Sequence, residues 1–400
     1  MNKSFTFAAA ITMLSVSSMA VNASPTSLRV ATFNVSMEAL NYVPYQRGIA
    51  PKLTGHELAD ALANNNPQIR NIAEIIQRIN PDIILLNEFD RTDEQHTNIK
   101  KFLQYYLAKS QHHQTPINFP YFYRGPVNTG VNSGYDLNRD GKSGKLPEDG
   151  FGFGYFPGHF AMALLSKYPI DKHAIRTFQK FKWADMPNAL KTYLPNSTTP
   201  WYSDAAWQHL RLSSKSHWDI PINVHGNIIH ILASHPTPPV FDGDEDRNGK
   251  RNHDEIRFWH DYVHPTKATY IYDDHQQTGG LANNQRFIII GDQNASSVEG
   301  DAIRSGISLL LTDPSIQDAK PASEGGQLDQ ADNPFAINHT ASWGMRADYV
   351  LPSKQGFKII NSGIFWPKKS APTYRLIKDR QASSDHRLVW VDLQITPIKP

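Results

Sequence analysis

The sequence predicts an α/β fold in which two β-sheets pack face to face with helices outside. Short apolar runs recur along the chain, and those at residues 83–86 and 287–290 contain no polar residue. Such runs are typical of strands buried on both faces. Well-formed amphipathic helices are few, and residues 67–79 form the clearest one. Many buried strands with few helices favour two packed sheets.

The composition is that of a globular protein with many loops. The chain has 400 residues, of which 40% are hydrophobic, and this is enough for one large core. Its formal charge of +2 gives no general reason to bind nucleic acid or membrane, although a local patch would suffice for either. There is no cysteine, which excludes thiol catalysis, disulfides and cysteine-based zinc sites.

Residues 1–23 have the pattern of a secretory signal peptide. Lys3 supplies a positive charge, residues 5–19 are apolar or small, and a small-x-small cleavage site ends at Ala23. A membrane anchor is the alternative, but the apolar run is shorter than a span of about 20 residues. We therefore expect a secreted or periplasmic protein without a transmembrane segment. Residues 24–400 would form a single domain, which we expect to be a monomer.

The predicted elements follow in order. Residues 28–35 form the first strand by their β-branched and aromatic content. Asn66 caps the helix at 67–79, and Pro67 occupies its first turn. One face of that helix carries the isoleucines 69, 72, 75, 76 and 79. Further strands are predicted at 83–86, 160–165, 228–233, 287–290, 348–351 and 388–391, with loop insertions near 110–158, 180–220 and 236–256.

Polar residues recur where these apolar strands begin or end. Asp385-His386 joins a carboxylate that can hold a divalent cation to an imidazole that can move a proton near neutral pH. Asp292 and Asn294 would lie on the same side of an extended backbone, although a turn also favours them. Asp348 could pair with Arg346 at the surface or orient a catalytic histidine. The remaining members of this group are Asn34, Glu88 and His235.

In their order and strand context, these features resemble the endonuclease/exonuclease/phosphatase superfamily. The resemblance runs from about residue 28 to residue 394, and the departures at Asn87 and Gln293 are minor. It implies a four-layer α/β/β/α sandwich with two mainly antiparallel sheets. It also implies hydrolysis of phosphate esters that depends on Mg²⁺ or Mn²⁺. The matching segments are Phe33-Asn34-Val35, Asn87-Glu88, Ser234-His235, Gly291-Asp292-Gln293-Asn294, Arg346-Ala347-Asp348-Tyr349-Val350 and Ser384-Asp385-His386.

The resemblance further implies a role for each matched residue. Glu88 would bind the metal ion, with Asn34 and Asp385 close to it. A metal ion and two imidazoles would neutralise the charge that builds on the phosphorus oxygens. The implied catalytic residues are Asp292 to orient the attacking water, Asn294 to contact phosphate, His386 held by Asp348 as general base or acid, and His235 to stabilise the scissile phosphate.

Two segments resemble calcium-binding loops. Residues 244–255 fit the twelve-residue pattern, and a helix is predicted after them. The proposed ligands are Asp244, Asp246, Asn248, the carbonyl of Lys250, Asn252 and Glu255. A second loop would use Asp136, Asn138 and Asp140, closed by Glu148 or Asp149. The alternative in both cases is a solvated polar turn.

The substrate stays open at this point. The leading hypothesis is a secreted phosphoesterase acting on a phosphodiester or phosphomonoester. The alternatives are an extracellular endonuclease acting on DNA or RNA, a phospholipase C-type enzyme, and a calcium-dependent binding protein without catalysis. Loops between residues 110 and 220 resemble those of secreted bacterial members. Lys215 and its neighbours to Trp218 could contact phosphate, and Tyr155, Phe156 and Trp201 could line the cleft, although core packing is the ordinary role of such aromatics.

Overall fold

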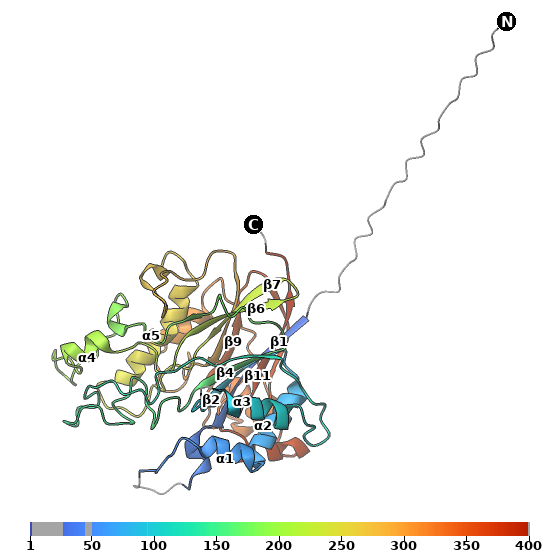
Figure 1. Cartoon of the computed structure of the whole chain (residues 1–400), viewed down its shortest axis with the longest axis horizontal. Helices are drawn as coiled ribbons and strands as arrows, with labels where there is room; N and C mark the ends of the chain where they lie inside the picture. The colour runs from blue at the N-terminus through green and yellow to red at the C-terminus, as the bar shows by residue number, and fades with distance from the viewer. Residues whose placement is uncertain (2–26, 45–49, 94, 399–400) are drawn as a thin grey trace.

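Two β-sheets lie against each other at the centre of the computed structural model, which describes residues 1, 27–44, 50–93 and 95–398 (Figure 1). The first sheet has six strands in the order β10-β11-β1-β2-β4-β3. Their bounds are β1 Ser27–Met37, β2 Ile83–Phe89, β3 Tyr121–Tyr123, β4 Met162–Ser166, β10 Phe357–Ile364 and β11 Val389–Ile395. The second sheet has five strands in the order β5-β6-β7-β8-β9. Their bounds are β5 Arg176–Thr177, β6 Trp218–Val224, β7 Asn227–Ala233, β8 Arg286–Asp292 and β9 Asp348–Pro352.

Both sheets mix parallel and antiparallel pairs. Among the described strands, β1 with β2 and β7 with β8 are parallel, and the other neighbours are antiparallel. Parallel neighbours need a long crossover connection, and helices supply it in both cases. As a result, the carboxyl ends of β1 and β2 lie together in one sheet, and those of β7 and β8 lie together in the other.

Helices cover the outer faces of the two sheets. In Figure 1, α1, α2 and α3 gather on one side of the strands, and α4 and α5 lie on the other. The α-helices are α1 Glu57–Ala63, α2 Pro67–Ile79, α3 Thr97–Lys101, α4 Asp204–His209, α5 Arg247–Tyr262, α6 Ser305–Leu311 and α7 Glu324–Asp329. The short helices of other types are η1 Ala39–Tyr42, η2 Phe102–Leu107, η3 Trp183–Asp185, η4 Ala268–Tyr270, η5 Ala336–Asn338 and η6 Pro372–Leu376.

The helix predicted at 67–79 is confirmed as α2. The side chain of Asn66 accepts a hydrogen bond from the backbone N–H of Gln68, and Pro67 occupies the first turn. Asn80 ends the helix in the left-handed conformation. The isoleucines at 69, 72, 75 and 76 are buried against the first sheet, and Ile79 packs against the same core while partly buried. An amphipathic sequence therefore forms a helix whose apolar face covers a sheet.

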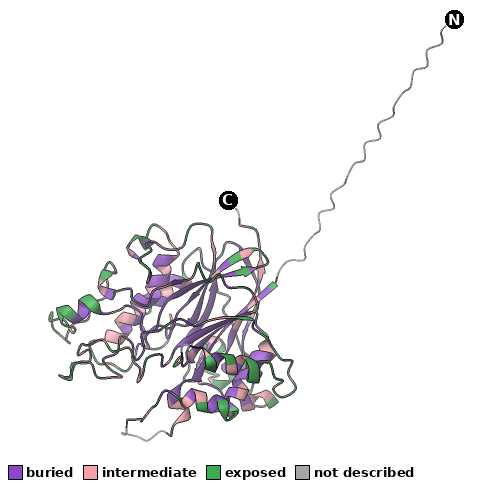
Figure 2. Ribbon diagram, in the orientation of Figure 1, coloured by how far each residue is buried: buried purple, intermediate pink, exposed green. Residues whose placement is uncertain are grey.

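The largest hydrophobic core lies between the sheets and under α2. It contains Phe33 and Leu85 of the first sheet and Ile220, Ile288 and Val350 of the second. A second core joins the outer face of the five-stranded sheet to α5 and α6. Figure 2 shows the strands as almost continuously buried and the helices as exposed on their outer sides. The predicted fold of two packed sheets with outer helices is confirmed.

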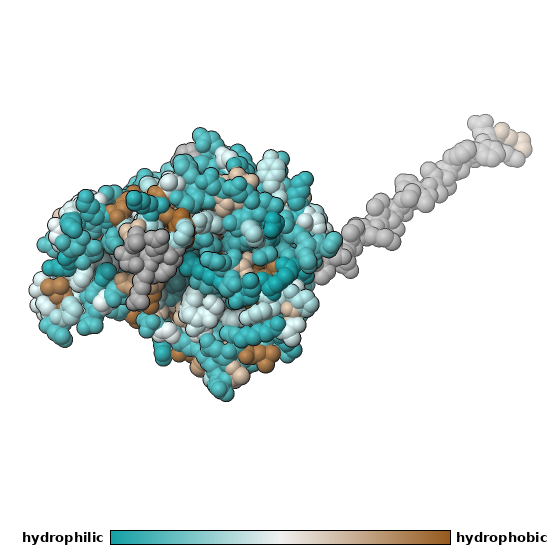
Figure 3. All heavy atoms as spheres, turned by 90° about the horizontal axis from the view of Figure 1, so that it is seen from below, coloured by the Kyte–Doolittle hydropathy of each residue, from teal (hydrophilic) through white to brown (hydrophobic). Residues whose placement is uncertain are grey.

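The outer surface is mainly polar. On the face shown in Figure 3, hydrophobic residues lie in small separate groups among hydrophilic ones. None of the described helices is both long enough and apolar enough to cross a membrane. The predicted signal peptide lies outside the described residues, apart from Met1.

Gly291, just before Asp292, lies where the second sheet approaches the first. Its φ of +138° is a conformation that L side chains rarely adopt. A Cβ atom there would lie 2.1 Å from the carbonyl oxygen of Ser234, a backbone atom that has no room to move aside. The backbone of β8 can therefore reach the end of β7 only with glycine at this position.

We expect Gly291→Ala to lower the free energy of unfolding by about 2–3 kcal/mol more than Gly226→Ala does, because only the first substitution adds an overpacking clash. Gly226 also has a positive φ, of +86°, but a Cβ atom there would meet nothing within 4 Å. Its replacement should cost only about 1 kcal/mol of backbone strain. Urea unfolding of both variants measures this difference, and equal losses would contradict the close approach.

Candidate active site

One carboxylate oxygen stands at the centre of the predicted site. Oδ2 of Asp292, at the end of β8, accepts a hydrogen bond of 3.1 Å from Nδ2 of Asn34 in β1. It also lies 3.4 Å from Nε2 of His235, which follows β7, and 3.5 Å from Nε2 of His386, which precedes β11. The structure therefore brings together residues of both sheets that are up to 352 positions apart in the chain (386 − 34).

His386 is oriented by Asp348, as predicted. Its Nδ1 lies 2.9 Å from Oδ2 of Asp348 at the start of β9, and that oxygen also accepts from the hydroxyl of Thr340 at 2.7 Å. Burial by itself lowers the pKa of His386, but the carboxylates of Asp348 and Asp292 outweigh it and raise that pKa to about 10. The imidazole is therefore protonated at neutral pH, and its Nε2–H faces Asp292.

Asp292 is held in place from several directions. Its Oδ1 accepts from the backbone N–H of Asn294 at 2.9 Å. Asn294 has a φ of +50°, and its side-chain amide donates to the carbonyl of Pro236. Burial raises the pKa of Asp292 to about 6, although His386 opposes this shift. The carboxylate is thus largely ionised at neutral pH and is close enough to neutrality to accept a proton.

His235 differs from His386 because it has no carboxylate partner at Nδ1. Burial, together with the nearby charges of Lys215 and His386, keeps the pKa of His235 well below its usual value. Its Nδ1 is buried and has no hydrogen-bond partner among the described residues. An unpaired buried polar atom is costly, so this nitrogen, which is not the one that faces Asp292, indicates a group that a ligand completes.

Carboxylates cluster on the other side of Asn34. Glu88, the last residue but one of β2, has a φ of +56°, and its pKa is raised to about 7 by burial and then by the charges of Glu38 and Asp385. Burial alone would raise the pKa of Asp385 as well, but His386 and Arg380 outweigh it and lower that pKa. The amide oxygen of Asn34 accepts from the N–H of Ser36.

These side chains fit a divalent cation. Mg²⁺ and Mn²⁺ prefer oxygen ligands. Burial, and then repulsion by Glu38 and Asp385, raises the pKa of Glu88, and a bound cation would remove that repulsion. The predicted ligands Glu88 and Asp385 share this cluster, and Asn34 lies between it and Asp292. Asp292, Asp348 and His386 also bring one ligand atom each within 4.8 Å of one another.

A family model for the endonuclease/exonuclease/phosphatase family matches residues 31–386, which include every residue of this cluster. The chain belongs to the endonuclease/exonuclease/phosphatase family. Members of this family are metal-dependent phosphoesterases and nucleases. None of the curated proteins matches the chain.

Solved structures resemble this member of the family at low sequence identity. An endonuclease/exonuclease/phosphatase from Beutenbergia cavernae is 16% identical, with a TM-score of 0.52, over 93% of this chain and 72% of that one. A family protein from Leptotrichia buccalis is 14% identical over 92% and 100% of the two chains, with a TM-score of 0.45. The human nocturnin catalytic domain with bound sulfate is 13% identical over 93% and 94%, with a TM-score of 0.45.

Three residues beside the acidic cluster escaped the sequence analysis. Glu38 accepts from Nε2 of His159 at 3.0 Å and from the guanidinium of Arg380 at 3.3 Å. Glu38 follows Asn34 and Ser36 at alternate positions, so the period of a strand could have indicated it. His159 and Arg380 lie in irregular segments, where no periodicity points to the site.

Trp343 is a fourth residue that the sequence analysis missed. Its ring stands edge-on to His386 with ring centroids 4.9 Å apart, and the residue is 50% exposed. It therefore places a partly exposed aromatic surface beside His386.

In the segment from Lys215 to Trp218, the lysine is the residue whose charge affects the site, because, in addition to burial, it lowers the pKa of His235. Burial lowers the pKa of Lys215, against the opposing charges of Glu255, Glu88 and Asp292, and the lysine in turn affects His235. Trp218 is buried in β6 against Tyr123. The ring of His217 is buried against α5, where its Nε2 bonds the carbonyl of Glu255.

Of the aromatic residues proposed to line the cleft, two lie near the acidic cluster and one does not. Tyr155 and Phe156 pack around His159, with ring centroids 5.8 and 4.7 Å from it. They thus lie behind the histidine that supports Glu38. Trp201 lies in a separate loop region, where its indole N–H donates to the carbonyl of Leu137.

The calcium loop predicted at 244–255 is wrong as a loop, because α5 begins at Arg247 and runs through it. The carboxylate of Glu255 is fully buried and accepts from the backbone N–H groups of Ser214 and Thr237, each at 2.6 Å. Residues 247–255 point in different directions around a helix, so the predicted ligands do not surround one point. This correction applies to Asp244, Asp246, Asn248, Lys250, Asn252 and Glu255 as one ligand set.

Two of these side chains instead tie α5 to the active site. The amide of Asn252 donates to the carbonyls of Thr237 and Gln293, at 2.8 and 2.9 Å. Together with Glu255, it fixes the segments that follow His235 and Asp292. Asn248 donates to the carbonyl of Val240 and holds the preceding turn.

The second predicted calcium loop is a closed turn. Asp136 accepts from the N–H groups of Asp140 and Gly141, and Asn138 also accepts from Asp140. Asp149 closes the turn by accepting from Leu137 and Lys145. Calcium binding by Asp136, Asn138 and Asp140 stays a prediction.

We expect Asp348→Asn to flatten the pH dependence of stability in the metal-free protein. The pKa of His386 is about 10 in the folded state and about 6.5 when unfolded. Its protonation therefore stabilises the fold fully below about pH 6.5, and this stabilisation is lost as pH rises towards 10. Without the Asp348 charge the folded pKa falls.

We expect urea unfolding at pH 7, 8 and 9, with chelator present, to show that the free energy of unfolding falls more steeply with pH in the wild type than in Asp348→Asn. The difference in slope can reach about 1.4 kcal/mol per pH unit, the value for one proton. Equal slopes would show that Asp348 does not set the charge of His386.

Proposed function

We propose that the protein hydrolyses a phosphodiester or phosphomonoester by attack of water, with Mg²⁺ or Mn²⁺ as cofactor. The observation that carries this proposal is the meeting of Asn34, His235 and His386 at one oxygen of Asp292, beside a separate cluster of carboxylates. Glu88, Asp385 and Asn34 would hold the ion. When bound, the ion would neutralise negative charge on the phosphoryl oxygens.

The other side chains of the site each have a distinct role in the proposed reaction. Asp292, whose pKa is about 6, orients the attacking water and accepts its proton. His386 donates a charged hydrogen bond to the oxygens around phosphorus, and Asp348 keeps its ring in position. His235 is neutral, so it contributes a neutral hydrogen-bonding ring nitrogen. Asn294 lies beside Asp292, where it can contact phosphate.

A nuclease is the second candidate, and Trp343 is the observation that favours it. An exposed indole beside the catalytic histidine offers a stacking surface for a nucleobase, and such stacking requires no particular base. A substrate with an aromatic group would use Trp343, whereas a simple phosphomonoester would not.

Variants of the catalytic residues test the reaction. Asp292→Asn and His386→Ala should lower turnover by about 10² or more, because each removes a proton-transfer or charge-stabilising group. Asp332→Asn and His173→Ala are matched controls, since both residues are exposed and neither belongs to the candidate site. The assays are chromogenic phosphate mono- and diesters, plasmid DNA and sphingomyelin, each with Mg²⁺, Ca²⁺ or chelator. Full activity in a folded Asp292→Asn protein would refute the mechanism.

We also propose that the protein is exported to the periplasm or the medium after cleavage near Ala23. The support is the charged start, the apolar stretch and the small residues at its end. Fractionation of expressing cells, followed by mass spectrometry, should find a chain that begins near residue 24 outside the cytoplasm. An intact Met1 on cytoplasmic protein would contradict export.

A further inference from the structure

A second group of metal-ligating side chains lies where the ends of α5 and α6 meet. His260 belongs to the last turn of α5, and His264 follows two residues after that helix ends. Asp313 follows two residues after the end of α6. Each offers one ligand atom, and these atoms lie within 4.8 Å of one another. None of the three belongs to the catalytic cluster.

The distances suit a tetrahedral ion. Oδ2 of Asp313 lies 3.4 Å from Nε2 of His260 and 2.6 Å from Nε2 of His264. Ligand atoms at about 2.0–2.1 Å from a tetrahedral Zn²⁺ stand about 3.3 Å apart. The first distance already has this value, and the second would have to open by about 0.7 Å. His264 is free to make that shift, because its side chain is 30% exposed.

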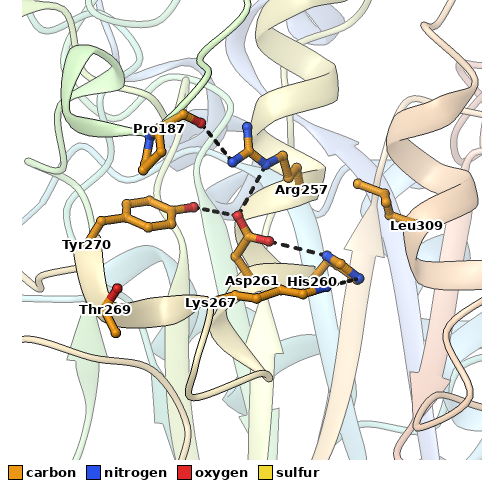
Figure 4. A pocket seen from close by; sticks show the side chains of 8 residues that line it. All are labelled: Pro187, Arg257, His260, Asp261, Lys267, Thr269, Tyr270 and Leu309. Carbon is orange, nitrogen blue, oxygen red and sulfur yellow. Dashed lines mark hydrogen bonds and ion pairs between the residues drawn. The ribbon is translucent and has the colours of Figure 1, made fainter.

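Two of these ligands have the hydrogen-bond partners that are usual in metal sites. Oδ1 of Asp313 is held by the N–H and hydroxyl of Ser315, which leaves Oδ2 to face the histidines. Nδ1 of His260 lies 3.3 Å from Oδ1 of Asp261, whose other oxygen accepts from Tyr270 (Figure 4). Histidine ligands usually donate their second N–H to such a carboxylate, which directs the other nitrogen at the metal.

Lys267 marks the place that a cation would take. Its Nζ lies 3.3 Å from Nε2 of His260 and, as a donor without lone pairs, it requires that nitrogen to be unprotonated. Lys267 is exposed and can swing away. A pocket of about 360 Å³, lined by His260, Lys267 and Tyr270 among others, opens His260 to solution, and His264 is itself partly exposed.

We propose that His260, His264 and Asp313 bind a transition-metal ion, with Zn²⁺ as the preferred one. Two imidazoles and one carboxylate select Zn²⁺ over Mg²⁺ or Ca²⁺, which prefer all-oxygen sites. The ion links the carboxyl ends of α5 and α6, where helix dipoles favour positive charge. It therefore stabilises α5, the helix whose Asn252 and Glu255 hold the segments next to His235 and Asp292.

The test is titration of the metal-free protein with Co²⁺ and Zn²⁺ in excess Mg²⁺, which occupies the oxygen-rich catalytic site. The wild type should bind about one Co²⁺ with the visible absorption of a tetrahedral nitrogen–oxygen site, and Zn²⁺ should displace it. His264→Gln and Asp313→Asn should weaken binding at least about tenfold, since each loses a ligand. Zn²⁺ should raise the melting temperature of the wild type and not of these variants.

Two further variants complete the design. His173→Ala removes an exposed histidine elsewhere and should bind Co²⁺ like the wild type. Lys267→Gln removes the competing cation and should bind several-fold more tightly. Mg²⁺-dependent hydrolysis should persist in His264→Gln, which separates this site from the catalytic one. Equal Co²⁺ binding by the wild type, His264→Gln and Asp313→Asn would overturn the proposal.

Discussion

The arrangement of the site depends on the buried carboxylate of Asp292. A carboxylate away from water is costly unless polar groups surround it. Here Asn34 donates a hydrogen bond, and the ring nitrogens of His235 and His386 lie 3.4 and 3.5 Å away. Asn34 and His386 are supplied by the first sheet, and His235 by the second. The packing between the sheets therefore sets the distances around one oxygen atom. That packing is tight, because a Cβ atom at Gly291 would lie only 3.3 Å from Cδ2 of Leu85 in the first sheet. A close-packed interior can hold such distances with little freedom.

Asn34 separates two electrostatic environments. Its amide nitrogen binds Asp292, which lies near the charged imidazole of His386, and its amide oxygen binds the N–H of Ser36 beside the acidic cluster. On the side of Asp292, the protonated imidazole of His386 supplies a positive charge. On the second side negative charge dominates, although His159 and Arg380 contact Glu38 and Arg380 also lies near Asp385. A neutral amide can serve both sides at once, whereas a charged residue would strengthen one and disturb the other.

The sequence predicted those site residues that stand next to a recognisable strand. Apolar runs identify the buried strands, and the polar residues at their ends identify Asp292 and His386, because a strand end determines where the next side chain can lie. Arg380 and Trp343 reach the site from irregular segments, and only the tertiary structure places them. The calcium pattern failed for a related reason: the spacing of oxygen-bearing residues does not reveal whether the backbone coils into a helix. Glu255 has a carboxylate that could bind calcium, but this carboxylate is buried and accepts hydrogen bonds from two backbone N–H groups instead.

The attachment of α5 has a consequence for protein engineering. Residues 236–256 look like an insertion in the sequence, and insertions are ordinarily the segments that one shortens or exchanges between homologues. Here Asn252 and Glu255 bond the backbone at Thr237, and Asn252 also bonds that at Gln293, so the segment acts as a scaffold for the ends of β7 and β8. A chimera that replaced it with a shorter connection would keep every side chain of the candidate site and still lose their alignment. Any graft at this position must carry its own acceptor for the N–H group of Ser214 and its own donor for the carbonyl of Gln293.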